Sequence, residues 1–258
     1  MKILKILAAA GIALATLSGA ATADMAGKKV RVGTEGAYPP FNFKDASGEL
    51  KGFDIDIAKA LCAAMKAECS FVAQDWDGII PALLAKKYDA IIASMSITDE
   101  RKKKVDFTDK YYSTPAKFIV DKKGGISDVS VDGLKGKTVG AQGSTIHANF
   151  LEDVYKGANV KLYKTQDEAN ADLAAGRLDA ILADSAVLND WLKTKDGNCC
   201  KFTGPGFNDP KYFGVGAGIA VRKGDDELRE ALNKAIKTIL DDGTYKKIND
   251  KYFPFSVY

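Results

Sequence analysis

The sequence predicts an α/β protein of two similar lobes, because one strand-like segment occurs twice and its neighbours are repeated with it. The segments KKYDAIIASMS at 86–96 and AGRLDAILADS at 175–185 share an Asp, an Ala, two branched apolar residues and a small residue. Short apolar runs that follow a helical pattern are typical of parallel strands covered on both faces. Ligands bind beyond the carboxyl ends of such strands, where Ser94 and Asp184 stand. Facing lobes would bring these two side chains into one cleft.

The duplication extends to the flanking elements. A strand that enters a glycine-containing turn is predicted at 28–36 and again at 135–144, and a strand followed by a helix at 70–85 and again at 160–176. Each half therefore has the order strand, helix, strand, helix, strand; the alternative is a chance resemblance between ordinary α/β segments. The first half also carries YPPFNFKDASGELKGF at 38–53, in which D-A-S-G supplies turn chemistry for a hairpin.

The N-terminal region has the pattern of a secretory signal peptide. Two lysines precede an apolar stretch at 6–17, and small residues follow up to Ala23. The stretch is too short to span a membrane, so we predict a signal peptide over 1–23 with cleavage before Asp24. No Cys stands at the cleavage site, which argues against a lipid anchor. The remaining 258 − 23 = 235 residues suffice for two modest lobes, and we expect them in the periplasm, with release into the medium as the alternative.

Charge and motifs argue against several classes of function. Without the two lysines of the signal peptide the chain has 37 − 2 = 35 basic residues against 34 acidic ones, which gives no electrostatic case for nucleic acid. The basic run at 102–104 is expected to be a solvated helix face. The GKT at 136–138 lacks the glycine that a phosphate loop requires at position 131, GVGAG at 214–218 leads into a strand-like segment, and no G-x-S-x-G is present. No catalytic residue and no cofactor are therefore predicted.

Four cysteines in an exported chain favour disulfide formation. Cys62 falls late in the amphipathic stretch FDIDIAKALCAAMKAEC and Cys69 lies just past its end, so a short-loop disulfide is sterically reasonable. The adjacent Cys199 and Cys200 can form a vicinal disulfide, remain reduced or pair between chains, and the sequence leaves these possibilities open. No metal site is predicted, because no C-x-x-C spacing exists and the chain has a single histidine. That residue, His147, is expected at the surface or on a cleft rim.

Two segments suit the recognition of a carboxylate. Thr98 is expected to cap a helix that carries Arg101 at its start, where a planar guanidinium can bind a carboxylate in a bidentate manner. The alternative for this arginine is a surface ion pair with Asp99 or a neighbour. The corresponding helix of the second half opens at Ser144 and Thr145, whose backbone N–H groups would form an anion site from the other side.

Other side chains suit the rest of an amino acid. Asp184 can pair with an ammonium group. The flat faces of Trp76 and Tyr38 can hold an aliphatic or guanidinium chain, although aromatic residues beside strands commonly serve as plain core. Together with the carboxylate segments, these residues point to a zwitterionic ligand.

Eight segments resemble the periplasmic basic-amino-acid-binding proteins of ABC importers, solute-binding protein family 3, which include lysine/arginine/ornithine, histidine, arginine and opine binders. The segments are GTEGAYPPF, GFDIDIAKALC, WDGIIPALLAKKYDAI, SMSITDERKKKVDFT, VGAQGST, GRLDAILAD, YFGVGAG and DGTYKKINDKYF, in family order over nearly the whole mature chain. The resemblance implies a type II two-lobe fold, with each lobe a sheet flanked by helices. Lobe I would comprise residues 25–113 and 216–258, and lobe II would comprise residues 117–212. Two segments near 113–116 and 213–215 would form the hinge.

The resemblance also implies which residues bind the two α-groups of the ligand. Arg101, Ser96 and the Thr145 backbone would meet the α-carboxylate. Asp184 and the edge formed by Ser94 and Ser96 would meet the α-ammonium. The residues implied for the two groups are Ser94, Ser96, Arg101, Ser144, Thr145 and Asp184. The pair Cys62 and Cys69 also matches the family disulfide.

The ligand side chain would lie between Tyr38 and Trp76, with its distal cation at Glu35 and with Asp54 in a supporting position. Lysine-type binders often have Asp in place of Glu35 and Ser in place of Ala93; here the longer acid reaches farther and the alanine leaves room. Both choices also occur in opine-like binders, whereas Asp184 favours a free α-ammonium. We therefore expect arginine first, then ornithine or lysine, with histidine or an opine behind.

The function implied is capture of an amino acid by lobe closure, followed by recognition of the closed form by a membrane permease. The expected partners are thus a small-molecule ligand and the permease, for a monomer that binds no nucleic acid. Two alternatives use the same scaffold: a dehydratase-like enzyme, which would need an acid/base pair in the cleft, and a sensory module that acts through a membrane receptor.

Overall fold

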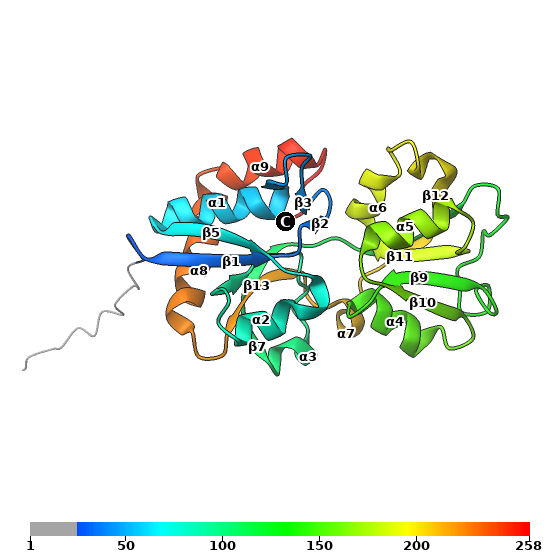
Figure 1. Cartoon of the computed structure of the whole chain (residues 1–258), viewed down its shortest axis with the longest axis horizontal. Coiled ribbons are helices and arrows are strands. Elements are labelled where there is room, and N and C mark those ends of the chain that lie inside the picture. The colour runs from blue at the N-terminus through cyan, green and yellow to red at the C-terminus, as the bar shows by residue number, and fades with distance from the viewer. Residues whose placement is uncertain (1–24) are drawn as a thin grey trace, which may run out of the picture.

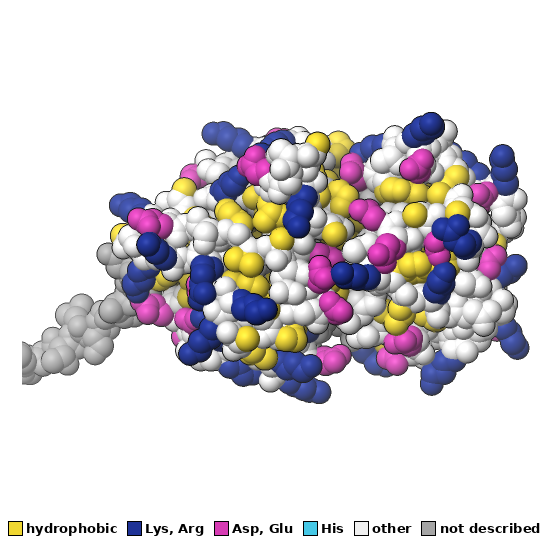
Figure 2. Space-filling view, viewed as in Figure 1, with side chains coloured by type: hydrophobic (Ala, Val, Ile, Leu, Met, Phe, Trp, Pro, Cys, Tyr) yellow, Lys and Arg dark blue, Asp and Glu magenta, His cyan; other side chains and the backbone are white. Residues whose placement is uncertain are grey.

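The computed structural model describes residues 25–258, which form two lobes, each built on a mixed five-stranded sheet (Figure 1). The predicted signal peptide lies outside the described residues. Within 25–258, every helix is too short or too polar to cross a bilayer. Acidic and basic side chains are interspersed on the face shown in Figure 2, in keeping with the balanced charge of the chain.

The first sheet has the strand order β5-β1-β6-β13-β7. Its strands are β1 (Lys29–Thr34), β5 (Glu68–Ala73), β6 (Ala90–Ile91), β7 (Val105–Tyr112) and β13 (Ala217–Arg222). The first three run parallel, and β13 lies antiparallel between β6 and β7. A strand from late in the chain therefore completes a sheet that begins at the N-terminus.

The second sheet repeats this plan, with the order β10-β9-β11-β8-β12. Its strands are β8 (Ala116–Asp121), β9 (Thr138–Gln142), β10 (Asn159–Tyr163), β11 (Ala180–Asp184) and β12 (Cys200–Phe207). Again three parallel strands are followed by β8, which is antiparallel to β11, and then by β12, which is antiparallel to β8. The predicted duplication is confirmed, because β1, β5 and β6 occupy the same places as β9, β10 and β11.

Helices cover both sheets, and two of them begin where the sequence predicts. Thr98 caps α3 by accepting a hydrogen bond from the Arg101 N–H, and Thr145 caps α4 by accepting one from the Ala148 N–H. The helices are α1 (Phe53–Met65), α2 (Ile79–Leu84), α3 (Asp99–Lys102), α4 (Ile146–Val154), α5 (Gln166–Ala174), α6 (Ser185–Trp191), α7 (Pro210–Phe213), α8 (Asp226–Asp241) and α9 (Thr244–Tyr252), with the 3₁₀ turns η1 (Trp76–Gly78) and η2 (Gly197–Cys199).

The core of the first lobe is rich in aromatic rings. Phe53 is fully buried where α1 packs against α8 and α9, and its ring contacts those of Phe41, Tyr111, Tyr112 and other aromatic residues. Burial of one such side chain contributes about 1.5–3 kcal/mol. This cluster holds the segment that follows β1 firmly against the lobe.

Three local features refine the sequence-based expectations. The predicted hairpin is present as β3 (Asn42–Lys44) and β4 (Leu50–Lys51), with β2 (Ala37–Tyr38) as a third strand. In the first repeat the strand β6 is shorter than the five-residue β11, because the chain turns at Ser94, whose φ is 54°. The Cys62–Cys69 disulfide is confirmed, and Cys199 and Cys200 are bonded to each other.

Candidate functional site

A cavity lies between the lobes, at the carboxyl ends of the repeated strands. Nine of the eleven side chains expected to bind the ligand line it. The complete lining is Glu35, Tyr38, Trp76, Ala93, Ser94, Ser96, Arg101, Gln142, Thr145, Ile146, His147 and Asp184. Ser94 and Asp184, which stand near the ends of the two repeated segments, therefore line one cavity although they lie far apart in the sequence.

The other two expected residues stand just outside this cavity. Asp54 is fully buried behind it and accepts hydrogen bonds from the Ser94 hydroxyl at 3.0 Å, the Tyr111 hydroxyl at 2.7 Å and the Asn42 amide at 2.8 Å. Burial raises its pKa to about 6. Ser144 lines the adjoining groove, and its carbonyl accepts a hydrogen bond from the Trp76 indole N–H at 2.9 Å.

One end of the cavity presents a partly buried cation, the guanidinium of Arg101. The Arg101 guanidinium donates to the Ser96 carbonyl at 3.0 Å and lies 5.2 Å from the centre of the Trp76 ring. Burial lowers the pKa of Arg101 to about 10, so the group stays charged at neutral pH. No carboxylate among residues 25–258 forms an ion pair with it. A partly desolvated charge without a counter-ion is unfavourable, and an anionic ligand group would relieve that cost.

The N-terminus of α4 lies at the same end of the cavity as Arg101. Thr145 is buried there and donates its hydroxyl hydrogen to the Gln142 carbonyl at 2.7 Å while it caps the helix. The first N–H groups of a helix have no partner within the helix, and the helix dipole favours an anion next to them. This end of the cavity is therefore suited to a carboxylate.

Asp184 provides negative charge in the wall of the same cavity. It ends β11, and its carboxylate accepts hydrogen bonds from the Tyr38 hydroxyl and the Thr114 hydroxyl, both at 2.9 Å. A carboxylate has about four lone-pair sites, so these two bonds leave acceptor capacity for a ligand ammonium. Arg101 and Asp184 thus provide opposite charges in the wall of one cavity.

Glu35 forms the acidic end of the cavity. It follows β1 directly, its residue is 8% exposed, and it accepts a hydrogen bond from the Gln142 amide at 2.5 Å. Burial raises the pKa of Glu35 to about 7, and the negative charges of Asp167 and Asp75 add to the shift. A cation placed beside this carboxylate would reverse the shift by favouring the ionised form.

The two lobes contact each other through side chains, in addition to the chain connections between β7 and β8 and between β12 and β13. Besides the Tyr38–Asp184, Trp76–Ser144 and Glu35–Gln142 contacts, the ammonium of Lys164 lies 2.8 Å from the carboxylate of Asp75. Lys164 follows β10 and Asp75 follows β5, which are equivalent strands of the two repeats. The structure is therefore a closed one.

Sequence reasoning missed three residues of the cavity wall. Gln142 and Ile146 are absent from the predicted set, and His147, expected at the surface or on a cleft rim, is instead 5% exposed and belongs to the cavity wall. The reason is that His147 is the second residue of α4, whose N-terminus faces the cleft. Burial lowers its pKa, which favours the neutral imidazole. Its place two residues after the predicted cap was the signal available in the sequence.

Comparison with known proteins agrees with this architecture. Residues 30–255 match the family model of the bacterial extracellular solute-binding proteins, family 3. The L-arginine-binding protein of Pseudomonas aeruginosa is 52% identical over 236 residues, covering 90% of this chain and 91% of that protein. The lysine/arginine/ornithine-binding periplasmic protein of Escherichia coli is 44% identical over 255 residues, covering 96% of this chain and 97% of that protein.

Solved structures give the same result. An ancestral arginine-binding protein bound to arginine superposes with a TM-score of 0.81 at 43% identity, covering 89% of this chain and 99% of that one. The expected type II periplasmic binding protein fold is thereby confirmed. With two repeated sheets, a cavity between them and these similarities, the chain belongs to the bacterial extracellular solute-binding proteins of family 3.

Proposed function

We propose that this protein is the periplasmic binding component of an ABC importer and that it captures a basic L-amino acid, arginine in preference to ornithine or lysine. The observation that carries the proposal is the arrangement of charge in the cavity: a partly buried Arg101 without an ion-pair partner among residues 25–258, Asp184 in the same wall, and a buried Glu35. These charges complement an α-carboxylate, an α-ammonium and a distal cation. The relatives named for arginine and for lysine/arginine/ornithine support this choice.

Each α-group would meet charges and dipoles of opposite sign. The α-carboxylate would bind the Arg101 guanidinium, Ser96 and the backbone N–H of Thr145. The α-ammonium would bind Asp184 and the edge formed by Ser94 and Ser96. Charge-assisted hydrogen bonds of this kind are roughly twice as strong as neutral ones. Because Arg101 and Asp184 belong to different lobes, the ligand would contact both lobes only when they are closed.

The side-chain end supports a preference for arginine. Glu35 can accept two parallel N–H bonds from a guanidinium, a geometry that an ammonium cannot match. Tyr38 and Trp76 would flank the aliphatic chain, and Ala93 leaves space in the wall. Ornithine and lysine would keep the charge but lose the bidentate contact. A histidine or opine ligand is the alternative that Glu35 and Ala93 also allow.

Closure would couple binding to transport. A ligand shifts a two-state equilibrium by its differential affinity for the two states, and the closed form would be recognised by the permease. We propose the segments near 113–116 and 213–215 as the hinge, since the chain passes there between β7 and β8 and between β12 and β13. The lobe limits 25–113 with 216–258, and 117–212, are part of the same proposal, as is a monomeric state.

We also propose that the protein binds without chemical conversion. A dehydratase-like enzyme would consume its ligand, whereas a binding protein returns it unchanged. Incubation with the preferred amino acid, followed by mass spectrometry of the small molecules, separates the two: a new product would contradict the proposal. A sensory role would share the binding chemistry, and capture by a membrane receptor instead of a permease would reveal it.

A thermal-shift screen over the common amino acids and a set of opines tests the ligand assignment. A ligand at 100 times its Kd stabilises the folded protein by about 2.7 kcal/mol, which is readily measured. We expect the largest shift with L-arginine, smaller shifts with ornithine and lysine, and little with D-arginine, whose α-groups are exchanged in space. A larger shift with a neutral amino acid would contradict the basic-ligand assignment, and no shift with any amino acid or opine would contradict the function itself.

A further inference from the structure

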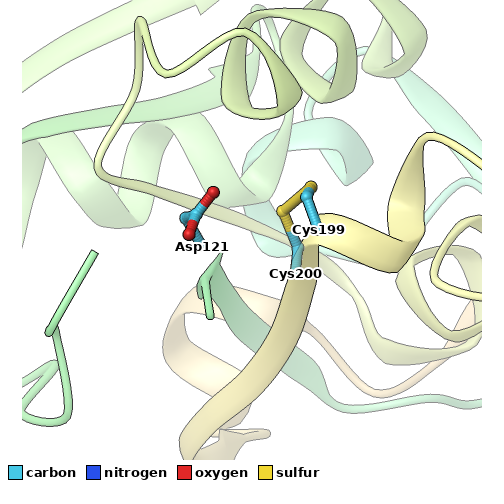
Figure 3. Close-up of side chains that lie close together, drawn as sticks. All are labelled: Asp121, Cys199 and Cys200. Carbon is cyan, nitrogen blue, oxygen red and sulfur yellow. A yellow bond between two sulfur atoms is a disulfide. The ribbon is translucent and has the colours of Figure 1, made fainter. Parts of the chain in front are cut away.

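A second group of chemically active side chains lies in the second lobe, outside the ligand cavity. Asp121 ends β8, and Cys200 begins β12 as its direct partner in the antiparallel register. Directly opposed residues of an antiparallel pair project from the same face of the sheet. The neighbouring Cys199 adds a second sulfur, and the ligand atoms of the three residues all lie within 4.8 Å of one another (Figure 3). We call these three residues the sulfur–carboxylate cluster.

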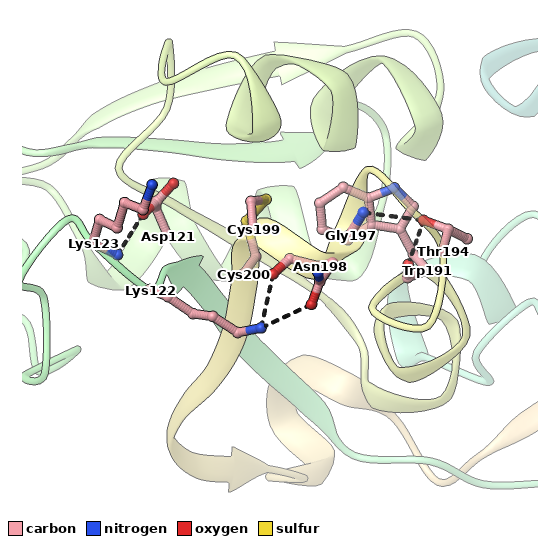
Figure 4. The surroundings of a disulfide bond; sticks show 9 residues. All are labelled: Asp121, Lys122, Lys123, Trp191, Thr194, Gly197, Asn198, Cys199 and Cys200. Carbon is pink, nitrogen blue, oxygen red and sulfur yellow. Dashed lines mark hydrogen bonds between the residues drawn. A yellow bond between two sulfur atoms is a disulfide. The ribbon is translucent and has the colours of Figure 1, made fainter.

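The backbone around the cluster is held by specific hydrogen bonds (Figure 4). The Lys122 ammonium donates to the Asn198 carbonyl at 2.7 Å, and the Lys122 N–H donates to the Cys199 carbonyl at 2.9 Å. The Gly197 N–H donates to the Thr194 hydroxyl at 3.0 Å. A Cβ at Gly197 would lie 2.0 Å from the Trp191 carbonyl oxygen, so the turn that delivers the cysteines requires glycine. The three side chains are thus set on a fixed frame.

We propose that the sulfur–carboxylate cluster is a redox-gated site for a zinc-class divalent cation. With the two sulfurs bonded to each other, as in this structure, neither is a thiolate and the site is closed. A dithiol reductant opens it: the sulfur–sulfur bond is reduced to two thiols while the reductant's two thiols are oxidised to a disulfide. The ion then binds both sulfurs as thiolates, with release of two protons to solvent, and the Asp121 carboxylate completes the protein's share of the ligands.

The donor set selects the kind of ion. Two thiolates and a carboxylate suit zinc or cadmium, which take four ligands in a tetrahedron and here would keep one position for water, whereas hard cations such as Mg²⁺ and Ca²⁺ prefer oxygen alone. Both sulfurs and a carboxylate oxygen of Asp121 lie within 4.8 Å of one another, close enough for all three to reach one ion. Among residues 25–258 no carboxylate joins the Cys62–Cys69 pair in a comparable group, so that disulfide serves as an internal comparison.

Cadmium titration of the full mature protein tests the proposal. Cd²⁺ is the probe, because its bonds to thiolates give an ultraviolet charge-transfer band. We expect the untreated protein to bind no Cd²⁺ at the cluster. After dithiol treatment and anaerobic removal of the reductant, we expect one ion bound there, with Cys199 and Cys200 protected from alkylation in peptide mapping. L-arginine binding, measured in parallel, reports that the fold is intact.

Three variants sharpen the test. Cys199→Ser with Cys200→Ser should abolish the protected site. Asp121→Asn should weaken Cd²⁺ binding by at least about tenfold, since loss of even an outer-shell partner costs about 10- to 100-fold. Cys62→Ser with Cys69→Ser is the matched control and should leave the site unchanged; if this control does not fold, alkylation mapping of the parent still distinguishes the two pairs. Any of three results would overturn the assignment. The Cys199–Cys200 bond could resist dithiols, Cd²⁺ could protect only Cys62 and Cys69 from alkylation, or Asp121→Asn could bind Cd²⁺ as tightly as the parent.

Discussion

The Tyr38 hydroxyl donates a hydrogen bond to the Asp184 carboxylate across the cleft, at 2.9 Å. Tyr38 belongs to β2 of the first lobe and Asp184 ends β11 of the second, so this bond ties the lobes together at the point where a ligand ammonium is expected. The same carboxylate also accepts a hydrogen bond from Thr114, in the proposed hinge segment. The group proposed to anchor the ligand is therefore also part of the closed form itself.

Tyr38→Phe should loosen closure without emptying the cavity of its aromatic wall. The variant removes one hydrogen bond between the lobes, worth about 0.5–1.5 kcal/mol, while Thr114 still supports Asp184. We expect a larger radius of gyration for the ligand-free variant in solution scattering, and arginine affinity reduced by up to about tenfold. Thr114→Val, which removes the other hydrogen bond to Asp184, from the proposed hinge segment and not from the first lobe, is the comparison variant. An equal scattering change in both variants would contradict the role assigned to Tyr38.

Arg101→Ala and Asp184→Ala should each disable binding. Each substitution leaves a ligand charge without its partner in a desolvated site, which costs about 2–5 kcal/mol. Calorimetric titration with arginine measures the loss, and circular dichroism checks that the fold remains. Arg31→Ala is the matched control, because Arg31 is an exposed arginine paired with Asp89. Binding within about threefold of the parent, under 1 kcal/mol, would show that the substituted residue does not anchor the ligand.

Glu35→Gln should weaken basic ligands selectively. The substitution keeps the shape of the side chain and removes its charge, so arginine, ornithine and lysine should lose about 1.5–3 kcal/mol, the scale of a hydrogen bond to a charged group. Glutamine and histidine should change far less. Asp77→Asn, an exposed neighbour whose charge acts on Glu35, should change affinity by under 1 kcal/mol. Equal weakening of all ligands by Glu35→Gln would leave only general amino-acid binding.

Arginine affinity should fall as the pH drops below about 7. Burial raises the pKa of Glu35 to about 7 in the ligand-free protein, so at lower pH a proton must leave before the carboxylate can pair with a cation. Each pH unit then costs up to about 1.4 kcal/mol, or tenfold in affinity. Titrations between pH 8 and pH 5 measure the slope, and Glu35→Gln should flatten it. An identical slope in the variant would assign the proton to another group.

The same pKa shift bears on the stability of the ligand-free protein. Folded Glu35 binds its proton more tightly than unfolded Glu35, whose pKa is near 4.5. Its contribution to stability is therefore fully present below that value and is lost as the pH rises to about 7. Bound arginine should remove this trend, because the pairing cation favours the ionised carboxylate.

Local sequence signals predicted much of the fold. The repeated segments gave three parallel strands per lobe, and Thr98 and Thr145 marked the helix starts that orient the carboxylate pole. Strand placement across the sheet was less accessible, because the fourth strand of each sheet pairs with strands distant in sequence. Thus β13 joins β6 more than 120 residues after it, and apolar periodicity does not encode such a partner.

The site was predicted as a set of residues and not as a set of contacts. Nine of the eleven expected side chains line the cavity, but Gln142, which bonds to Glu35 from the other lobe, carries no local signal of that role. Its contact with Glu35 becomes predictable only when the lobe that contains β9 is placed against the lobe that contains β1. Likewise, the burial of His147 depends on how α4 meets the cleft, which follows from the docking of two lobes.

The late position of β13 in the chain has a consequence for biogenesis. The second sheet is continuous in sequence from 116 to 207, so all of its strands have left a translocation channel before β13 does. The first sheet, in contrast, needs β13 between β6 and β7, and α1 needs α8 and α9 to cover its apolar side. A chain exported N-terminus first must therefore keep its leading third incomplete until its last 42 residues, from 217 to 258, emerge. A frameshift or proteolytic cut just before β13 would strip the amino-terminal strands of their partner while sparing the lobe in between.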